Sequence, residues 1–340
     1  MNPTRNVVMH TSLSGSDLRP PTLLSDFHQA SVEEAKSRFA GPEKVVAVDC
    51  PACSSADQRA AFTKNGFRYV ECGCCGSLYV SPRPRKSALE EYYTTSEAAQ
   101  LRVRYFTRDA AEARRIHVHN VRAAWVAQTL DDLGGPKTAT YLDVGTICPQ
   151  LIKAVASLGW FQTLLSFEPF PALPRDTLLT ADVVVTESPT GVAAATAFEW
   201  LEHQFSPFSL LCRIREALVE GGALFITLRG ISGFDLQVLW DAAEYIFVPE
   251  HLNLLSVEGA RILLERAGYE IVELSTPGQL DLELIQQVCK ENRDVRLPRF
   301  LEYLFAKRGE AALRDFQEFL QKHTLSSHIR VAAIKKGDAE

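Results

Sequence analysis

Short runs rich in β-branched and aliphatic residues alternate with helix-like segments through the second half of the chain. The runs are Tyr141–Val144, Thr163–Phe167, Asp182–Thr186, Val192–Phe198, Ala223–Leu228 and Tyr269–Leu274. Strands separated by helices predict a mostly parallel sheet, because a parallel strand reaches its neighbour only through a long crossover, usually a helix. Residues 280–322 are helix-rich and precede a last strand-like run, Ile329–Ile334. We therefore expect an α/β fold with helices on both faces of one sheet.

The clearest predicted helix is Pro207–Glu220. Ser206 can cap its N-terminus, Pro207 suits its first turn, and Gly221-Gly222 should end it. One face of this helix gathers the apolar residues Phe208, Leu211, Ile214 and Leu218.

Composition shifts along the chain divide it into five parts. Residues 1–44 form an N-terminal arm, in which residues 26–39 suit a short amphipathic helix, and residues 45–85 form a cysteine-bearing module. Residues 86–135, rich in Ala, Arg and Glu, form a helical connector. The sheet-bearing core spans residues 136–279, and residues 280–340 form a helical extension with the final strand.

Charge and hydropathy exclude several classes of protein. The 340 residues carry a net charge of −6, which disfavours general binding to nucleic acid or to an anionic membrane. No apolar run approaches the roughly 20 residues that span a bilayer, and no signal-peptide core follows Met1. We expect a cytoplasmic protein without membrane partners, in which the eight cysteines are metal ligands or free thiols rather than disulfides.

Two CxxC pairs stand about twenty residues apart in the cysteine-bearing module. Cys50 and Cys53 form the first pair, and Cys72 and Cys75 form the second. Each pair can present two thiolates to one tetrahedral ion, so the spacing predicts a zinc ribbon. A site of four cysteines leaves no open position for substrate, which indicates structural zinc; a degenerate site that has lost its metal is the alternative. Cys74 remains as a spare thiol.

Six basic residues and two acidic ones lie between positions 57 and 86, with aromatic residues among them. This excess of positive charge could recognise a nucleic acid or a phosphate-bearing substrate. A solvated protein face is the simpler interpretation.

Several blocks of the core are arranged in a familiar order. They are Tyr141-Leu142-Asp143-Val144-Gly145, Ser166-Phe167-Glu168-Pro169, Phe198-Glu199-Trp200-Leu201-Glu202-His203, the helix and turn Arg215–Gly222, and His251–Ser256 with Leu263–Tyr269. In this order and spacing the segment from about 140 to 275 resembles the class I S-adenosylmethionine (SAM)-dependent methyltransferases. The third block is close to the "EVLEH" segment of that family. The resemblance implies a Rossmann-like methyltransferase sheet with SAM as cofactor.

A module with two CxxC pairs ahead of such a core is similar to a group of zinc-ribbon methyltransferases. That group acts in sugar-nucleotide, surface-glycan or natural-product pathways. The resemblance implies structural Zn²⁺ and methyl transfer to a small polar metabolite in a biosynthetic pathway.

The family pattern also implies cofactor-binding residues. Glu168, followed by Pro169, ends the second strand, where the family places an acid on the ribose hydroxyls. Asp143 and Gly145 begin the cofactor loop, Glu187 ends the third strand near the expected adenine, and Phe198 ends the fourth. Exposed strand-end or loop-capping roles are the alternatives for Glu168 and Asp143.

The glycine-rich cofactor loop itself is altered. After Gly145 the chain continues Thr146-Ile147-Cys148-Pro149, where the family has a run such as GCGTG. Ile147 adds volume and Pro149 removes an N–H donor; each such change costs on the order of 1–3 kcal/mol of binding energy. The loop could instead follow another path.

Candidate groups for chemistry lie on the expected substrate side. His203 and His251 are candidate general bases, since imidazole takes up protons near neutral pH. Either could instead be a hydrogen-bonded structural histidine. Glu199 and Tyr245 are candidate substrate contacts.

Three functional hypotheses follow. The first is an active methyltransferase on a small-molecule substrate. The second is a catalytically inactive methyltransferase-like protein that assembles, as a homo-oligomer or with an active methyltransferase, in a structural or regulatory role. The third is a zinc-ribbon nucleic-acid binder, which the acidic net charge disfavours. A nicotinamide-dependent reductase is weaker still, because no GxGxxG follows a strand.

Overall fold

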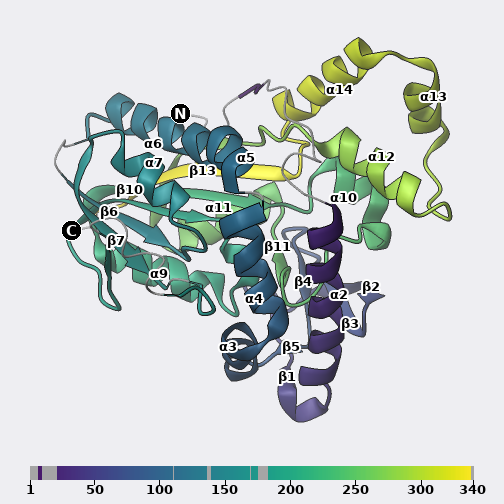
Figure 1. Ribbon diagram of the computed structural model, residues 1–340, viewed down its shortest axis with the longest axis horizontal. Helices are drawn as coiled ribbons and strands as arrows, with labels where there is room; N and C mark the ends of the chain where they lie inside the picture. Colours follow the sequence, from purple (N-terminus) through teal and green to yellow (C-terminus); the bar gives the residue numbers. More distant parts are fainter. Residues whose placement is uncertain are drawn as a thin grey trace.

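The computed structural model describes residues 7–9, 21–109, 111–135, 139–168, 170–174 and 183–337. Within them, a seven-stranded sheet organises the core (Figure 1). Its strands are β6 (Ala139–Val144), β7 (Phe161–Phe167), β8 (Val183–Val185), β9 (Val192–Phe198), β10 (Leu218–Arg229), β12 (Tyr269–Ser275) and β13 (His328–Lys335). The observed sheet confirms the predicted α/β fold.

The strand order is β12-β13-β10-β9-β6-β7-β8. The five strands from β10 to β8 pair in parallel, whereas β13 runs antiparallel to both β10 and β12. The chain crosses from β7 and β8 on one side of β6 to β9 and β10 on the other. The carboxyl ends of β6 and β9 therefore flank a switch point, where ligands bind in open α/β sheets.

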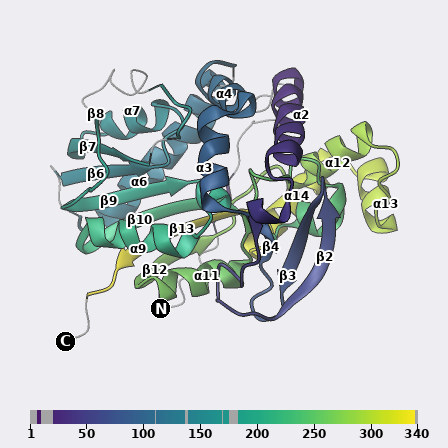
Figure 2. The same ribbon diagram turned by 90° about the horizontal axis from the view of Figure 1, so that it is seen from below.

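Alternating side chains divide the core between the two faces of the sheet. Tyr141, Ala194 and Phe225 pack under α6 (Asn120–Asp132) and α7 (Gln150–Ala156). Their neighbours Leu142, Ala195 and Leu224 share the other cluster with α9 (Pro207–Ala217) and α11 (Val257–Arg266). This period of two along the strands produces a sheet covered on both faces (Figure 2).

Helix α9 begins as predicted, with the Ser206 side chain accepting a hydrogen bond from the Ser209 amide, but it ends earlier. The predicted end at Glu220 was wrong, because Leu218 already pairs with Val192 as the first residue of β10. Gly221 has a φ of +71° inside an irregularity of that strand, so the glycines mark a strand bend rather than the helix end.

The cysteine-bearing module forms a second, smaller sheet of order β11-β4-β3-β2 in the described part of the chain. Its strands are β2 (Gln58–Lys64), β3 (Phe67–Cys72), β4 (Leu78–Val80) and β11 (Asn253–Leu254). Strand β11 comes from the sheet-bearing core of the chain, so a segment of that core completes the smaller sheet. A separate pair, β1 (Val45–Val46) with β5 (Arg83–Pro84), closes the module after the 3-10 turn η1 (Pro42–Lys44).

Helices surround both sheets. Helix α2 (Pro21–Arg38) lies beside α4 (Glu97–Arg104) (Figure 1). After α4 the helical connector continues through the π-helical turn η2 (Tyr105–Asp109), α5 (Ala111–Arg114) and the π-helical turn η3 (Arg115–His119). The other elements are α3 (Lys86–Thr95), η4 (Leu201–His203), α10 (Phe234–Leu239), η5 (Trp240–Ala242), α12 (Asp281–Glu291), α13 (Arg299–Lys307) and α14 (Glu310–Lys322). None of the helices in the described ranges is long and apolar enough to cross a bilayer.

Candidate functional site

Three strands of the core end side by side at one edge of the sheet. The residues that follow them are Gly145 after β6, Glu168 after β7 and Glu199 after β9, and their φ values are +75°, +46° and +52°. Side chains disfavour this left-handed conformation, so Glu168 and Glu199 are held in a strained backbone that is typical of functional sites. We call the space beside Gly145 at this edge the cofactor cleft.

Asp143 lies buried at the end of β6. Its carboxylate accepts hydrogen bonds from the hydroxyls of Thr146 at 2.5 Å and Thr196 at 2.8 Å. Burial raises its pKa to about 6 despite these bonds. The carboxylate therefore ties the cofactor loop to β9.

Trp200 closes the cofactor cleft. A β-carbon built on Gly145 would lie 2.2 Å from the indole ring, so the two residues are in direct contact. The ring is only 6% exposed and packs near Phe170, with ring centroids 6.1 Å apart. Its Nε1–H is buried and has no partner in the described part of the chain. An unpaired buried donor of this kind is uncommon and asks for an explanation.

The cleft that remains is small. It has a volume of about 60 Å³ and is lined by Asp143, Gly145, Ile147, Cys148 and Phe198, among other residues. Pockets that enclose a drug-sized ligand measure about 300–1,000 Å³. The residues present therefore suit SAM in kind, through the acid and the left-handed glycine, but the cleft needs the Trp200 indole to leave before it could accept a nucleoside.

Two other predicted cofactor residues, Glu168 and Glu187, do not line this cleft. The Glu168 carboxylate forms an ion pair with Arg213, and both side chains are partly exposed. Surface pairs of this kind contribute about 0–1 kcal/mol, so a ribose could replace Arg213 at little cost. Glu187 is exposed, and Pro169 lies outside the described residues.

A much larger cavity, of about 630 Å³, adjoins the cleft. The two share Arg102, Phe106, Arg114, Arg122 and Glu199 in their walls. We call this larger space the acceptor cavity. The predicted residues Glu199, His203, Tyr245 and His251 all line it.

A buried ion pair fixes the orientation of His203. Arg102 pairs with Glu250, and both side chains are about 6–7% exposed. The same guanidinium lies 3.0 Å from Nε2 of His203. Arginine can only donate, so Nε2 accepts and the ring proton resides on Nδ1. Burial and Arg102 lower the pKa of His203 well below its usual value, so the ring is neutral, and its Nδ1 lies 3.8 Å from Glu250 Oε2.

Glu199 is the other charged group at the mouth of the cleft. Burial opposes its ionisation, but Arg122 and Arg114 outweigh this and hold its pKa well below the usual value. Arg122 forms the ion pair directly. The Glu199 side chain is 40% accessible. It lines both the cavity and the cleft, so a ligand in either space can reach this carboxylate.

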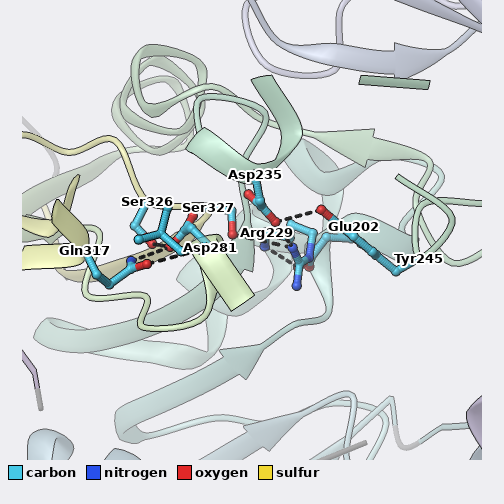
Figure 3. Close-up of polar contacts among 9 residues, drawn as sticks. Glu202, Arg229, Asp235, Tyr245, Asp281, Gln317, Ser326 and Ser327 are labelled. Atoms are coloured by element: carbon cyan, nitrogen blue, oxygen red, sulfur yellow. Dashed lines mark hydrogen bonds and ion pairs between the residues drawn. The ribbon is translucent and has the colours of Figure 1, made fainter. Parts of the chain in front are cut away.

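Polar groups that sequence reasoning missed converge on Arg229 (Figure 3). Its guanidinium pairs with Asp235 at 3.0 Å, and the Tyr245 hydroxyl donates to the same carboxylate at 2.8 Å. The backbone N–H of Arg229 donates to Glu202 at 2.7 Å. Burial and the neighbouring Glu199 raise the pKa of Glu202 to about 8, so its carboxyl is protonated at neutral pH.

Asp281 joins the helical extension to this network. Its carboxylate accepts from the Ser326 hydroxyl at 2.5 Å, the Ser327 N–H at 2.8 Å and Gln317 at 2.7 Å (Figure 3). Asp281 and Ser327 line the acceptor cavity. The C-terminal extension therefore builds part of the cavity wall.

Three buried polar atoms of the cavity lining have no hydrogen-bond partner within the described ranges. They are Glu202 Oε2, His203 Nδ1 and Thr227 Oγ1, on side chains no more than 7% exposed, and the buried Nε of Arg102 is a further unpaired atom of the lining. Most buried polar groups are paired, and each unpaired one loses its hydration. These atoms therefore indicate a polar ligand.

The four predicted zinc ligands come together away from the cavity. The sulfur atoms of Cys50, Cys53, Cys72 and Cys75 all lie within 4.8 Å of one another. Tetrahedral Zn–S bonds of about 2.3 Å place sulfurs about 3.8 Å apart, so the group fits structural zinc. The contact with Cys50, at 3.5 Å, lowers the pKa of Cys75, and a thiolate is the form that binds metal. Cys74 is exposed and outside the cluster.

Some missed residues carried a weak signal in the sequence. Glu202 and Glu250 directly precede the two candidate histidines, and Trp200 stands where the family segment has Val. Arg102 and Arg229 carried none, because their roles depend on contacts between segments far apart in the chain.

Comparison with known protein families agrees with this geometry. A family model described as "Methyltransferase domain" matches residues 116–274. No curated protein matches the chain. The match lies over the sheet-bearing core, so this part of the chain is similar to methyltransferase domains.

Solved structures with a similar chain course are distant in sequence. Phosphoethanolamine N-methyltransferase 2 of Haemonchus contortus, in complex with phosphomonomethylethanolamine and S-adenosylhomocysteine, is 16% identical, with a TM-score of 0.46 over 76% of this chain and 63% of that one. A Haloferax volcanii methyltransferase complex with the Trm112 activator is 13% identical, with a TM-score of 0.43 over 67% and 96%. Bacillus subtilis YcgJ is 12% identical, with a TM-score of 0.41 over 65% and 100%.

Proposed function

We propose that this protein transfers a methyl group from SAM to a small polar metabolite held in the acceptor cavity. The observation that carries the proposal is the set of unpaired atoms on Glu202, His203 and Thr227 in a cavity that adjoins the cofactor cleft. A volume of about 630 Å³ suits a metabolite of ordinary size. When bound, SAM supplies an electrophilic methyl group; the protein must align the acceptor and take up its proton.

Asp143, Gly145 and Phe198 would hold the cofactor, with Glu168 available to its ribose once Arg213 is displaced. Trp200 must swing away from Gly145 for this to happen. Its unpaired Nε1–H makes the closed position less favourable than a fully bonded one, which favours exchange with a ligand.

The two histidines take different parts in this proposal. His203 holds its proton on Nδ1 and donates to the acceptor, because Arg102 occupies Nε2. His251 is then the general base, and its ring lies 6.4 Å from that of His203 across the cavity lining. Protonated Glu202 and Thr227 add hydroxyl groups that can donate or accept.

An acceptor with several hydroxyl or amine groups meets these requirements, and a sugar or a natural-product intermediate is the class we favour. We place the protein in the reducing cytoplasm, where cysteines serve as metal ligands or free thiols.

Calorimetric titration of the zinc-loaded protein with SAM and S-adenosylhomocysteine tests the proposal. We expect saturable binding that weakens at least tenfold in Asp143→Asn and strengthens in Trp200→Val. Transfer of labelled methyl to polyhydroxylated or amine acceptors should then be lost in His251→Asn with cofactor affinity unchanged. Folded wild-type and Trp200→Val proteins that both give no binding heat at millimolar ligand would refute the proposal.

A further inference from the structure

One wall of the acceptor cavity is held from outside by the cysteine-bearing module. The wall segment, residues 249–256, carries Glu250 and His251, which both line the cavity. The Tyr69 hydroxyl, on β3, donates to the carbonyl oxygen of His251 at 3.1 Å. The Val80 amide, on β4, donates to the carbonyl oxygen of Leu252 at 3.0 Å.

The same wall segment continues into the smaller sheet. Asn253 and Leu254 form β11 and pair with Tyr79 and Leu78 of β4. The module therefore fixes backbone groups on the four consecutive residues from His251 to Leu254. A buried arginine reinforces the junction: Arg83 donates to the carbonyls of Val80 at 3.1 Å and Phe205 at 2.9 Å.

The far end of the wall segment is tied to the metal ligands themselves. The Ser256 hydroxyl donates to the carbonyl oxygen of Cys75. The Ser256 amide donates to the Ser77 hydroxyl at 3.1 Å, and the oxygen of that hydroxyl lies 3.3 Å from the sulfur of Cys75. Gly259 packs so closely here that a β-carbon would lie 2.0 Å from Ser77 Oγ. Tyr69 stands three residues before the ligand Cys72 in the same strand.

We propose that the zinc ribbon is a positioning element of the acceptor site, and that Tyr69 is the positioning residue which connects it to His251. Zinc fixes Cys72 and Cys75, and these fix Tyr69 and Ser77 against the two ends of the wall segment. The wall then presents Glu250 and His251 to the cavity in one arrangement. The inference rests on the proposed function only for the role of His251 as a base.

Hydrogen exchange of the zinc-loaded, full-length protein tests the connection without needing a substrate. Tyr69→Phe removes one hydroxyl, and Tyr79→Phe is its matched control. Both tyrosines are fully buried, but the Tyr79 hydroxyl has no partner among the residues that the structure describes. We expect amides of the wall segment to exchange about three- to tenfold faster in Tyr69→Phe and at the wild-type rate in Tyr79→Phe.

Zinc removal by a chelator should speed exchange of the wall segment by a larger factor, while amides of β6 and β9 keep their protection. The His251 ring resonance should shift in Tyr69→Phe and stay in place in Tyr79→Phe. Equal exchange and unshifted resonances in both variants, or unchanged exchange without zinc, would overturn the inference. Titration with S-adenosylhomocysteine tests the proposed function separately. The affinity of the protein for this ligand should be the same in Tyr69→Phe and Tyr79→Phe, whatever the exchange rates of the wall segment are.

Discussion

The indole ring of Trp200 lies against Gly145, so close that a β-carbon at position 145 would come within 2.2 Å of it. In this position the ring fills the space beside the cofactor loop and leaves a cleft of about 60 Å³. A methyl donor would have to approach Gly145 closely, but the Trp200 side chain already occupies the space beside this glycine. Cofactor affinity therefore depends on how readily Trp200 leaves.

Replacing Trp200 by Val should tighten binding of S-adenosylhomocysteine by about tenfold or more. When only a fraction of molecules has an open site, the apparent affinity falls by that fraction, and the smaller side chain removes this loss. Thermal stability should fall at the same time, by about 2–4 kcal/mol, because a large buried side chain is truncated. Calorimetry and thermal unfolding measure the two effects.

Trp160→Val is the matched control for that experiment. Trp160 is partly buried and directly precedes β7, at the end of the sheet opposite to the cofactor cleft. It should lose stability without any gain in affinity. Tighter binding in both variants would mean that general loosening, rather than Trp200, controls access.

Gly145→Ala should destabilise the fold for two separable reasons. Its β-carbon meets Trp200, and its φ of +75° disfavours any side chain. In a double-mutant cycle, Gly145→Ala introduced into the Trp200→Val protein should no longer cause the steric clash. The remaining loss in the free energy of unfolding should be about 1 kcal/mol, from the backbone conformation. Denaturant unfolding of the four proteins gives the coupling energy, and additive effects would show that the contact is not made in solution.

Glu202 should make a contribution to the stability of the protein that is lost as the pH rises from 7 to 8. Its pKa is about 8 in the folded protein and near 4.5 when unfolded, so the folded state holds a proton that the unfolded state has released. Stability contributed by the neutral carboxyl is complete below pH 4.5 and is lost as the pH passes 8; its full size is at most about 5 kcal/mol.

Glu202→Gln should flatten this dependence, because an amide cannot ionise. Asp143 and Asp281 have pKa values raised to about 6, and the buried histidines, whose pKa values are lowered, titrate in the unfolded state mostly below pH 7. The window from pH 7 to 8 therefore separates Glu202 from both groups. Unfolding midpoints across that window provide the measurement. The exposed Glu187→Gln should keep the wild-type slope; an equal flattening in both variants would count against the assignment.

One zinc ion per chain should be measured by elemental analysis, and Cys72→Ser should lose it. Cys74→Ser is the control, because Cys74 is exposed and stands outside the group of four sulfurs. We expect the unfolding midpoint to drop in Cys72→Ser and not in Cys74→Ser, since metal binding contributes to folding. Full zinc content in Cys72→Ser would require a different set of ligands.

The strands of the sheet could be predicted because each is marked by residues that are close together in the sequence. Runs such as Val192–Phe198 match the observed strand, and the crossover helices follow from the spacing. The end of α9 was placed too late, because pairing of Leu218 with Val192 depends on a partner strand that the local sequence does not specify. The π-helical turns on either side of α5 were not predicted for the same reason.

The candidate site was predictable in its residues but not in their partners. Sequence reasoning placed Glu199, His203 and His251 on the substrate side, and the structure puts all three in the lining of one cavity. It had no means to see that Arg102 occupies one nitrogen of His203 or that Arg213 pairs with Glu168. Such pairs join segments 45 to 101 residues apart, and only the folded chain brings them together.

The walls of the two spaces come from different stretches of the chain. Every residue that lines the cofactor cleft lies between Arg102 and Trp200, whereas the acceptor cavity also uses residues 277–291 and 327–330. A change confined to the chain after residue 270 would therefore reshape one wall of the acceptor cavity and leave the lining of the cofactor cleft as it is.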